Sequence, residues 1–168
     1  MIIFLIGFMG SGKSTLGKRL AKKIGYDFVD MDYHIEEQEG MKVPAIFEKK
    51  GERYFRDQEK RFLEELEKDA NLVVATGGGA PCFGKNIDIM NEKGITVYLK
   101  MSPSALASRL ERARVIRPLV AGLESEHLRQ YIENKLHERE PYYNQAKCII
   151  RGESAKPFHI TSLVFGTE

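Results

Sequence analysis

The sequence predicts an α/β domain with a mostly parallel sheet and helices on both faces. Short apolar runs, each typical of a strand buried on both sides, alternate with longer amphipathic stretches. Such alternation indicates parallel strands joined by helical crossovers. The 168 residues amount to one domain, and no internal repeat or linker divides them. We therefore expect a single domain over residues 1–168.

Five strands and four helices follow from this pattern. The strands are expected at Ile2–Ile6, Asp27–Asp30, Leu72–Ala75, Thr96–Leu99 and Lys147–Ile150. Apolar residues at helical spacing predict helices at Lys13–Ile24, Arg53–Lys68, Pro103–Arg112 and Glu124–Asn144. Between the last two helices, Pro118 and Gly122 favour a loosely held segment over residues 113–125. The alternative for that segment is a short docked helix, because its apolar residues also recur at helical spacing.

Charge and cysteine content exclude several classes of protein. Lys and Arg number 26 against 24 Asp and Glu, and a net charge of +2 gives no reason to expect nucleic acid or an anionic membrane as partner. No apolar run is long enough to span a bilayer.

Two cysteines, Cys82 and Cys148, are too few for a disulfide framework and predict reduced thiols in the cytoplasm. No apolar patch stands out beyond the expected core, so we expect a monomer.

A phosphate-binding motif follows the first strand. Residues 7–14, Gly-Phe-Met-Gly-Ser-Gly-Lys-Ser, match the pattern of Gly, four residues, Gly-Lys-Ser/Thr, between a buried strand and an amphipathic helix. Backbone N–H groups and the helix dipole are expected to bind a nucleotide's phosphates. Lys13 can reach the β- and γ-phosphates, and the Ser14 hydroxyl can bind Mg²⁺. The expected nucleotide contacts are Gly10, Ser11, Gly12, Lys13, Ser14 and Thr15.

An aspartate at the end of a second buried strand is expected to complete a site for one magnesium ion. Among the predicted strands only Asp27–Asp30 ends in one, so Asp30 is the expected partner of Ser14. Asp32 lies two residues further on, and in an extended chain both carboxylates would face the phosphate side of the sheet. The alternative is that Asp32 only caps a helix starting near Tyr33.

A glycine triplet and three arginines point to the second substrate. Gly77, Gly78 and Gly79 follow a buried strand, and glycines there let a ligand approach the backbone closely. Ligands of open parallel sheets bind beyond the carboxyl ends of the strands. Arg56, Arg117 and Arg139 are candidates for holding an anion, although each taken alone is typical of a solvated surface charge.

Taken together, these motifs resemble those of bacterial shikimate kinases over nearly the whole chain. The resemblance rests on Asp30-Met31-Asp32, the Gly-Glu-x-x-Phe-Arg-x-x-Glu run ending at Glu59, the triplet Gly77–Gly79, Arg117-Pro118-Leu119, and Arg139-Glu140-Pro141-x-Tyr143. It implies a P-loop NTPase fold of the nucleoside-monophosphate-kinase type, with three layers and a parallel sheet in the order 2-3-1-4-5. It also implies transfer of the ATP γ-phosphoryl group to the 3-hydroxyl of shikimate, in chorismate and aromatic amino-acid biosynthesis.

The same resemblance implies roles for individual residues. Asp32 would receive the shikimate hydroxyls and act as base, Arg56 and Arg139 would hold the carboxylate, and Gly77–Gly79 would line the substrate. Arg117, in a mobile lid at 113–125, would reach the phosphates and act in catalysis with Lys13 and Asp32.

Two further expectations concern the substrate lobe and the adenine. Residues 32–62 would form a substrate-binding lobe, in which Phe47 and Phe55 either wall the pocket or simply pack in the core. An arginine before the lid would stack on adenine, and the candidates are Arg109, Arg112 and Arg114.

Three rival functions remain at this point. A gluconate kinase is disfavoured by the glycine triplet together with the Arg56 run. A nucleoside monophosphate kinase is disfavoured because Asp32 suits a hydroxyl better than an anionic phosphate. A non-catalytic nucleotide-binding module is disfavoured by the intact set Lys13, Ser14, Asp30 and Asp32.

Overall fold

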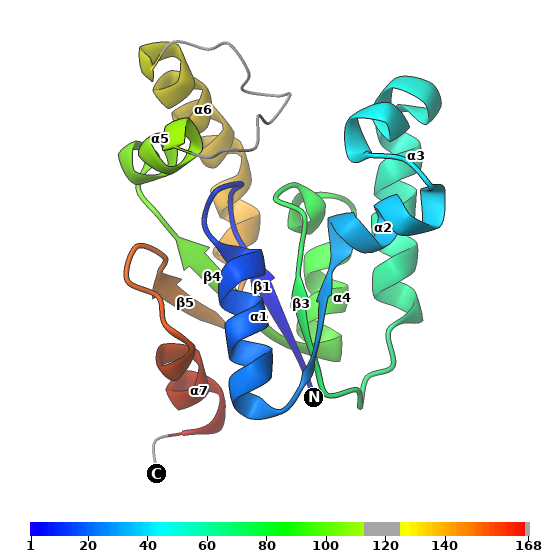
Figure 1. Cartoon of the computed structure of the whole chain (residues 1–168), viewed down its shortest axis with the longest axis vertical. Coiled ribbons are helices and arrows are strands. Elements are labelled where there is room, and N and C mark those ends of the chain that lie inside the picture. The colour runs from blue at the N-terminus through cyan, green and yellow to red at the C-terminus, as the bar shows by residue number, and fades with distance from the viewer. Residues whose placement is uncertain (113–124, 167–168) are drawn as a thin grey trace.

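Five parallel strands form a single sheet in the order β2-β3-β1-β4-β5 (Figure 1). The computed structural model describes residues 1–112 and 125–166. The strands are β1 (Ile2–Ile6), β2 (Asp27–Asp30), β3 (Leu72–Ala75), β4 (Gly94–Lys100) and β5 (Cys148–Arg151). The fold class and the strand order implied by the resemblance are confirmed.

Seven helices and one 3₁₀ turn are present in the described part of the chain. They are α1 (Lys13–Ile24), α2 (Met31–Glu39), α3 (Val43–Glu65), the 3₁₀ turn η1 (Ala80–Cys82), α4 (Asn86–Lys93), α5 (Pro103–Arg112), α6 (Ser125–Tyr143) and α7 (Pro157–Phe165). The prediction missed α4 and α7, gave α2 only as an alternative that starts near Tyr33, and started α3 at Arg53 instead of Val43. Gly51, with φ 83° and ψ 162°, breaks α3 into two parts, so one helical period does not run through it.

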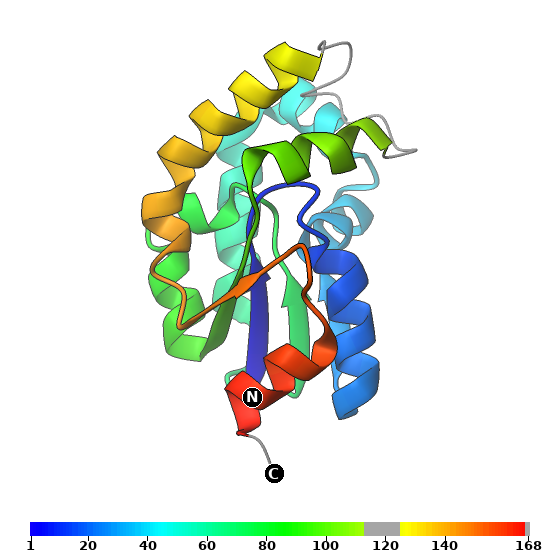
Figure 2. The same ribbon diagram turned by 90° about the vertical axis from the view of Figure 1, so that its left-hand side faces the viewer.

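The central strand β1 is buried on both faces and therefore belongs to two cores. Ile2, Phe4 and Ile6 pack with residues of α2 to α6, whereas Ile3 and Leu5 pack with α1 and α7. Alternate side chains of a strand point to opposite faces, so a run of apolar residues at every position is what a two-sided core requires. Figure 2 shows the sheet between these two helical layers.

The strand register places three functional segments at the same edge of the sheet. Leu5 pairs with Ala75, and Asp30 also pairs with Ala75, so β1, β3 and β2 end nearly level. Thr76 then bonds to the Leu5 carbonyl through both its backbone N–H and its hydroxyl, at 3.1 and 3.2 Å. The phosphate loop, the start of α2 and the glycine triplet therefore emerge side by side, where ligands of such sheets bind.

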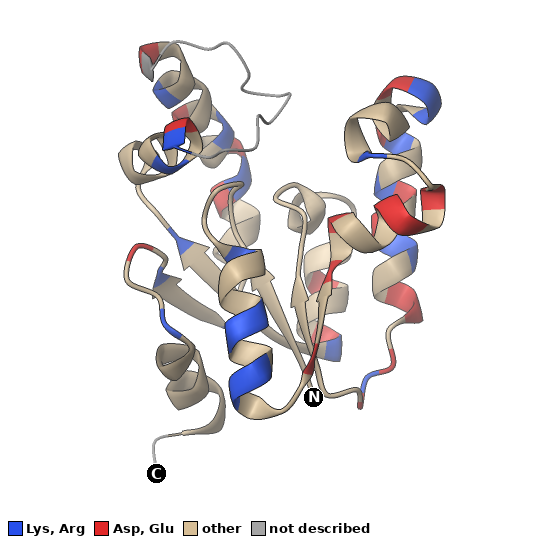
Figure 3. Cartoon of the chain, viewed as in Figure 1, with Lys and Arg blue, Asp and Glu red and all other residues tan. Residues whose placement is uncertain are grey.

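Within residues 1–112 and 125–166, no helix is both long and apolar enough to cross a membrane. Both cysteines are free thiols. Charged residues of both signs are spread over the surface helices, with Lys and Arg along α1 and acidic residues on α2 (Figure 3).

Candidate active site

The phosphate loop between β1 and α1 closes around the side chain of Lys13. The Lys13 ammonium is buried and donates hydrogen bonds to the carbonyl oxygens of Gly7 and Phe8, at 2.8 and 2.9 Å. Gly12 caps α1 in the left-handed conformation, with φ 95°. The first turn of α1 thus directs its unpaired N–H groups and Lys13 toward one place, which is the arrangement that binds phosphate.

Asp30 links the phosphate loop to α2. The Ser14 hydroxyl donates a short hydrogen bond of 2.5 Å to Asp30 Oδ2, while Asp30 Oδ1 accepts one from Tyr33 N at 3.4 Å. The residue that caps α2 is therefore Asp30, and the alternative in which Asp32 only caps a helix starting near Tyr33 is wrong. Asp32 lies within the first turn of α2, so the argument from an extended chain, in which both carboxylates face one way, does not apply.

The Ser14–Asp30 pair fits a magnesium ion. Mg²⁺ takes oxygen ligands and in kinases is held by one or two protein groups together with substrate phosphates. A hydroxyl and a carboxylate that already contact each other beside the phosphate loop provide such groups.

Each glycine of the triplet is abutted by a side chain that the resemblance assigned to the substrate site. A β-carbon added to Gly77 would lie 2.6 Å from Asp32 Oδ1 and 2.8 Å from Glu59 Oε1. One on Gly79 would lie 2.8 Å from Arg56 Nη2, and one on Gly78 would lie 3.5 Å from Arg139 Nη1. A β-carbon on Gly77 or Gly79 would displace one of these groups, whereas one on Gly78 would be in ordinary contact with Arg139 and closer to Met9 N, at 3.3 Å.

Arg56 is held in place from its own helix. Its guanidinium donates to Glu59 Oε2 at 2.8 Å and, through two nitrogens, to Glu52 Oε1 at 3.0 and 3.2 Å. Burial works to lower the pKa of Arg56, but the two carboxylates outweigh it and the pKa is raised. Glu52, Arg56 and Glu59 lie on one face of α3 because residues three and four apart are neighbours on a helix.

Glu59 is a completely buried carboxyl group. Burial raises its pKa to about 7, against the opposing influence of Arg56 and Arg139 and with a further increase from Asp32. Its second oxygen, Oε1, has no hydrogen-bond partner within the described part of the chain. Glu59 therefore titrates near neutrality and faces the same small space at Gly77 as Asp32.

Aromatic rings surround the arginines. The Arg56 guanidinium carbon lies 4.1 Å from the ring centre of Phe83 and 5.8 Å from that of Phe47. Phe55 is buried in the core, as one of the two expectations for it stated, and Phe47 packs against it. Phe83 was missed, although its place just after the triplet turn was a signal for it.

The last two turns of α6 approach the triplet from the other side. Arg139 lies 5.4 Å from the ring centre of Phe8 in the phosphate loop. One turn later, Tyr143 donates a hydrogen bond to the Gly78 carbonyl. Sequence reasoning assigned a role to Arg139 but none to Tyr143, which it cited only as part of a motif.

Of the adenine candidates, Arg109 is placed beside the phosphate loop. It donates to the Ser11 carbonyl at 3.1 Å and, at 3.4 Å, to the carbonyl of Gly152 in the loop after β5. Arg112 is exposed at the end of α5. Arg114 and Arg117, with all of the predicted lid except residue 125, lie outside the described residues.

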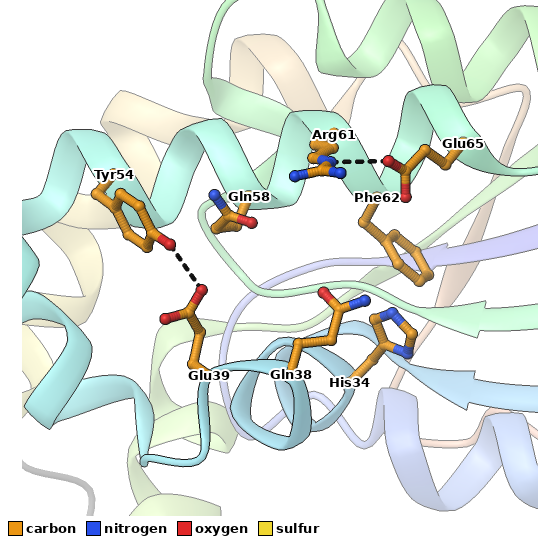
Figure 4. Close-up of a pocket in the computed structure, with 8 residues that line it drawn as sticks. All are labelled: His34, Gln38, Glu39, Tyr54, Gln58, Arg61, Phe62 and Glu65. Carbon is orange, nitrogen blue, oxygen red and sulfur yellow. Dashed lines mark hydrogen bonds and ion pairs between the residues drawn. The ribbon is translucent and has the colours of Figure 1, made fainter.

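A separate cavity of about 270 Å³ lies on the other face of α3, between it and α2 (Figure 4). Its lining is mostly polar and contains none of the predicted site residues: His34, Gln38, Glu39, Tyr54, Gln58, Arg61, Phe62 and Glu65. Arg61 pairs with Glu65 there at 2.7 Å, and both side chains are largely exposed. The two faces of α3 are thus distinct, with Arg56 and Glu59 directed to the triplet.

Comparisons with known proteins agree with this arrangement. The family model for shikimate kinase matches residues 9–164. A shikimate kinase of Parabacteroides distasonis is 44% identical over 151 residues, which cover 90% of this chain and 87% of that protein.

Solved structures of high similarity carry the same name. The crystal structure of shikimate kinase from Bacteroides thetaiotaomicron has a TM-score of 0.93 and 38% identity, covering 98% of both chains. Shikimate kinase from Acinetobacter baumannii in complex with shikimate has a TM-score of 0.87 and 36% identity, covering 98% of this chain and 92% of that one. With a family match and relatives above 40% identity along most of its length, this chain belongs to the shikimate kinase family.

Proposed function

We infer that this chain transfers the γ-phosphoryl group of ATP to the 3-hydroxyl of shikimate, giving 3-phosphoshikimate and ADP. The observation that carries the inference is the meeting of both expected sites at Gly78. A β-carbon there would lie 3.3 Å from Met9 N of the phosphate loop and 3.5 Å from Arg139 Nη1. An acceptor held at the triplet is therefore next to the nucleotide, as direct phosphoryl transfer requires.

On the acceptor side, Arg56 and Arg139 hold the shikimate carboxylate. A guanidinium matches a planar carboxylate with two parallel hydrogen bonds, and two guanidinium groups fix its orientation. Glu52 and Glu59 keep Arg56 in place for this task. Gly77, Gly78 and Gly79 line the ring, and Asp32 binds the hydroxyls and accepts the proton of the reacting one.

On the nucleotide side, the N–H groups of residues 10–15 and Lys13 bind the phosphates. Lys13 exchanges the carbonyls of Gly7 and Phe8 for the β- and γ-phosphate oxygens. Arg109 contacts the adenine, supported by its place between the phosphate loop and the loop after β5. Arg117, in the predicted lid, places its positive charge beside the phosphoryl group that is transferred.

One Mg²⁺ is proposed to accompany ATP, bound by Ser14 and, through water, by Asp30. When bound, it neutralises charge on the β- and γ-phosphates.

The organisation and setting of the domain are also proposals. Residues 32–62 form the substrate lobe and residues 113–125 the lid of a single domain that works as a monomer. The use of ATP and a net charge of +2 support a cytoplasmic enzyme whose partners are small molecules, with neither nucleic acid nor membrane among them.

Calorimetric titration of two variants tests the substrate site. Arg56→Ala and Arg139→Ala should each weaken shikimate binding at least thirtyfold, because truncating one side of a buried charged pair costs about 2–5 kcal/mol. Binding of ATP should stay nearly unchanged. Arg61→Ala is the matched control, since Arg61 is 70% exposed on the other face of α3. Equal losses for both ligands would indicate a folding defect and count against the assignment.

Two activity measurements complete the test. ADP release should depend on shikimate and not on gluconate or AMP; a preference for either of the latter would replace the proposed substrate. Asp32→Asn should slow single-turnover transfer by about 100-fold or more, since an amide cannot accept the hydroxyl proton. A normal rate in that variant would remove Asp32 from the reaction.

A further inference from the structure

Tyr143 makes a long-range hydrogen bond to the middle of the glycine triplet. The carbonyl of Gly77 accepts a hydrogen bond from Ala80 N at 3.2 Å, and the carbonyl of Gly79 accepts one from Cys82 N at 2.9 Å. Both bonds belong to the local turn that leads into η1. The carbonyl of Gly78, between them, accepts instead from the Tyr143 hydroxyl, 65 residues away.

Tyr143 is itself rigidly placed. Its side chain is completely buried, and its ring packs against that of Tyr98 on β4, with ring centres 5.0 Å apart. A buried hydroxyl needs a hydrogen-bond partner, and the Gly78 carbonyl provides it. Arg139 lies one helical turn earlier on the same helix, so α6 brings both residues to Gly78 together.

The bond to the Gly78 carbonyl also fixes the N–H of Gly79. The peptide unit is planar and trans, so the carbonyl of one residue and the N–H of the next point in opposite directions. With the carbonyl directed to Tyr143, the Gly79 N–H must point away from α6. Gly79 is the residue against which the Arg56 guanidinium lies. Glycines have no side chain to hold such a plane, so without the bond it would be restrained only by the local turn bonds on either side of it.

We propose that Tyr143 is a positioning residue, which sets the Gly78–Gly79 peptide plane so that the triplet, Arg56 and Arg139 present a preformed site to the substrate carboxylate. The proposal rests on the proposed function for the identity of that substrate. Tyr143 touches neither substrate in this scheme and acts through the backbone of the triplet, with its hydroxyl also beside the Arg139 side chain. Its contribution is to remove, before binding, the freedom that two adjacent glycines would otherwise lose on binding.

The test compares Tyr143→Phe with Tyr98→Phe. Both remove a hydroxyl from one member of the same buried ring pair, but only the Tyr143 hydroxyl bonds to the Gly78 carbonyl. Burial, and after it the nearby Glu140 carboxylate, raises the pKa of Tyr98. Tyr143→Phe should raise the dissociation constant and KM for shikimate about three- to tenfold, the loss expected for one hydrogen bond. The affinity for ATP and the kcat at saturating shikimate should change less than twofold. Tyr98→Phe should leave both ligand affinities unchanged.

Hydrogen exchange gives a readout that is independent of activity. In the free protein, a peptide covering residues 76–83 should exchange faster in Tyr143→Phe than in the wild type, while β1 and β4 keep their protection. Unchanged exchange of that peptide, an unchanged shikimate affinity, or an equal effect of Tyr98→Phe would each overturn the proposal. Failure of the proposed function would differ, because the wild-type protein itself would then neither bind nor phosphorylate shikimate.

Discussion

Two glycine-rich turns lie side by side in this molecule and use glycine for different reasons. In the phosphate loop, Gly10 and Gly12 have φ values of 82° and 95°, a left-handed conformation that other residues rarely adopt. In the triplet after β3, none of Gly77, Gly78 and Gly79 has a positive φ. What the triplet requires is space, because a β-carbon would collide with Asp32 at Gly77 and with Arg56 at Gly79, and would lie 3.3 Å from Met9 N at Gly78.

The difference shows that glycine in a sequence can have either of two structural causes, a left-handed backbone or the close approach of neighbouring side chains. The phosphate loop needs a particular backbone path, so that its N–H groups converge on a charge. The triplet needs three side chains from other elements to come close to an ordinary backbone. Substitutions should therefore damage the two turns in different measurable ways.

The largest loss of activity is expected from removing the charge of Lys13 in the phosphate loop. Lys13→Ala should lower turnover at least 100-fold, since loss of one preorganised contact to transition-state charge costs roughly that much. The folded structure should survive, which circular dichroism checks. A variant that kept more than about a tenth of wild-type activity would exclude Lys13 from the phosphate site.

Glu59 makes the space beside Gly77 sensitive to pH. Its pKa is about 7 in the folded protein and ordinarily 4.5. Between these values the folded state holds a proton that the unfolded state has lost, so stability falls as pH rises from about 5 to 7. In Glu59→Gln this loss should be absent, a difference of up to about 3 kcal/mol.

Urea unfolding from pH 5 to 8 measures this difference between the wild type and Glu59→Gln. Glu65→Gln is the control, because Glu65 is 60% exposed beside the cavity on the other face of α3. A constant difference between Glu59→Gln and the wild type across this range would contradict the titration of Glu59.

In the phosphate loop, a substitution of glycine is expected to strain the backbone. Gly12→Ala should lower the free energy of unfolding by about 1–3 kcal/mol, since an alanine is strained at φ 95°. It should also weaken ATP binding. Gly25→Ala is the control: Gly25 has φ 71° with nothing near its β-carbon position, so stability should fall without an effect on ATP.

In the triplet, an added side chain is expected to disturb the neighbouring side chains and not the backbone. Gly77→Ala should leave stability within about 1 kcal/mol of the wild type, because its backbone suits alanine. Asp32 and Glu59 must move aside, and shikimate affinity should fall about tenfold, equivalent to about 1.4 kcal/mol. A loss of stability like that of Gly12→Ala, with shikimate binding intact, would show that the two turns do not differ in this way.

Much of the fold could be predicted because its signals are local. Strands β1, β2 and β3 have the predicted bounds, and β1 and β3 are buried throughout. The expectation that β2 is also buried on both sides is wrong, because β2 is an edge strand with none of its residues buried. Strand β4 is longer than predicted, from Gly94 to Lys100, because Gly94 and Ile95 still pair with β1. Helices α4 and α7 were missed because both are short and neither has a strong amphipathic period.

The sequence predicted which residues belong to the candidate site, but not which of them contact one another. Motifs identified Asp32, Arg56 and Arg139, and the structure brings all three to the triplet. Sequence could not show that Phe83 lies over Arg56 or that Tyr143 bonds to Gly78, since these contacts join elements far apart in the chain. The alternative of Asp32 as the cap of α2 could not be settled from sequence, because Asp30 and Asp32 offer the same side chain two residues apart and only backbone geometry distinguishes them.

Asp30, which bonds to Ser14 with one oxygen and caps α2 with the other, also has a thermodynamic consequence. A ligand that draws the Ser14 hydroxyl away alters the charge that α2 receives at its first turn, where Asp32 lies. Any resulting change in shikimate affinity must be matched by an equal change in nucleotide affinity when shikimate binds first, because coupling free energies are reciprocal. A single carboxylate thus couples the two substrates, and the binding of either one changes the affinity for the other by the same factor.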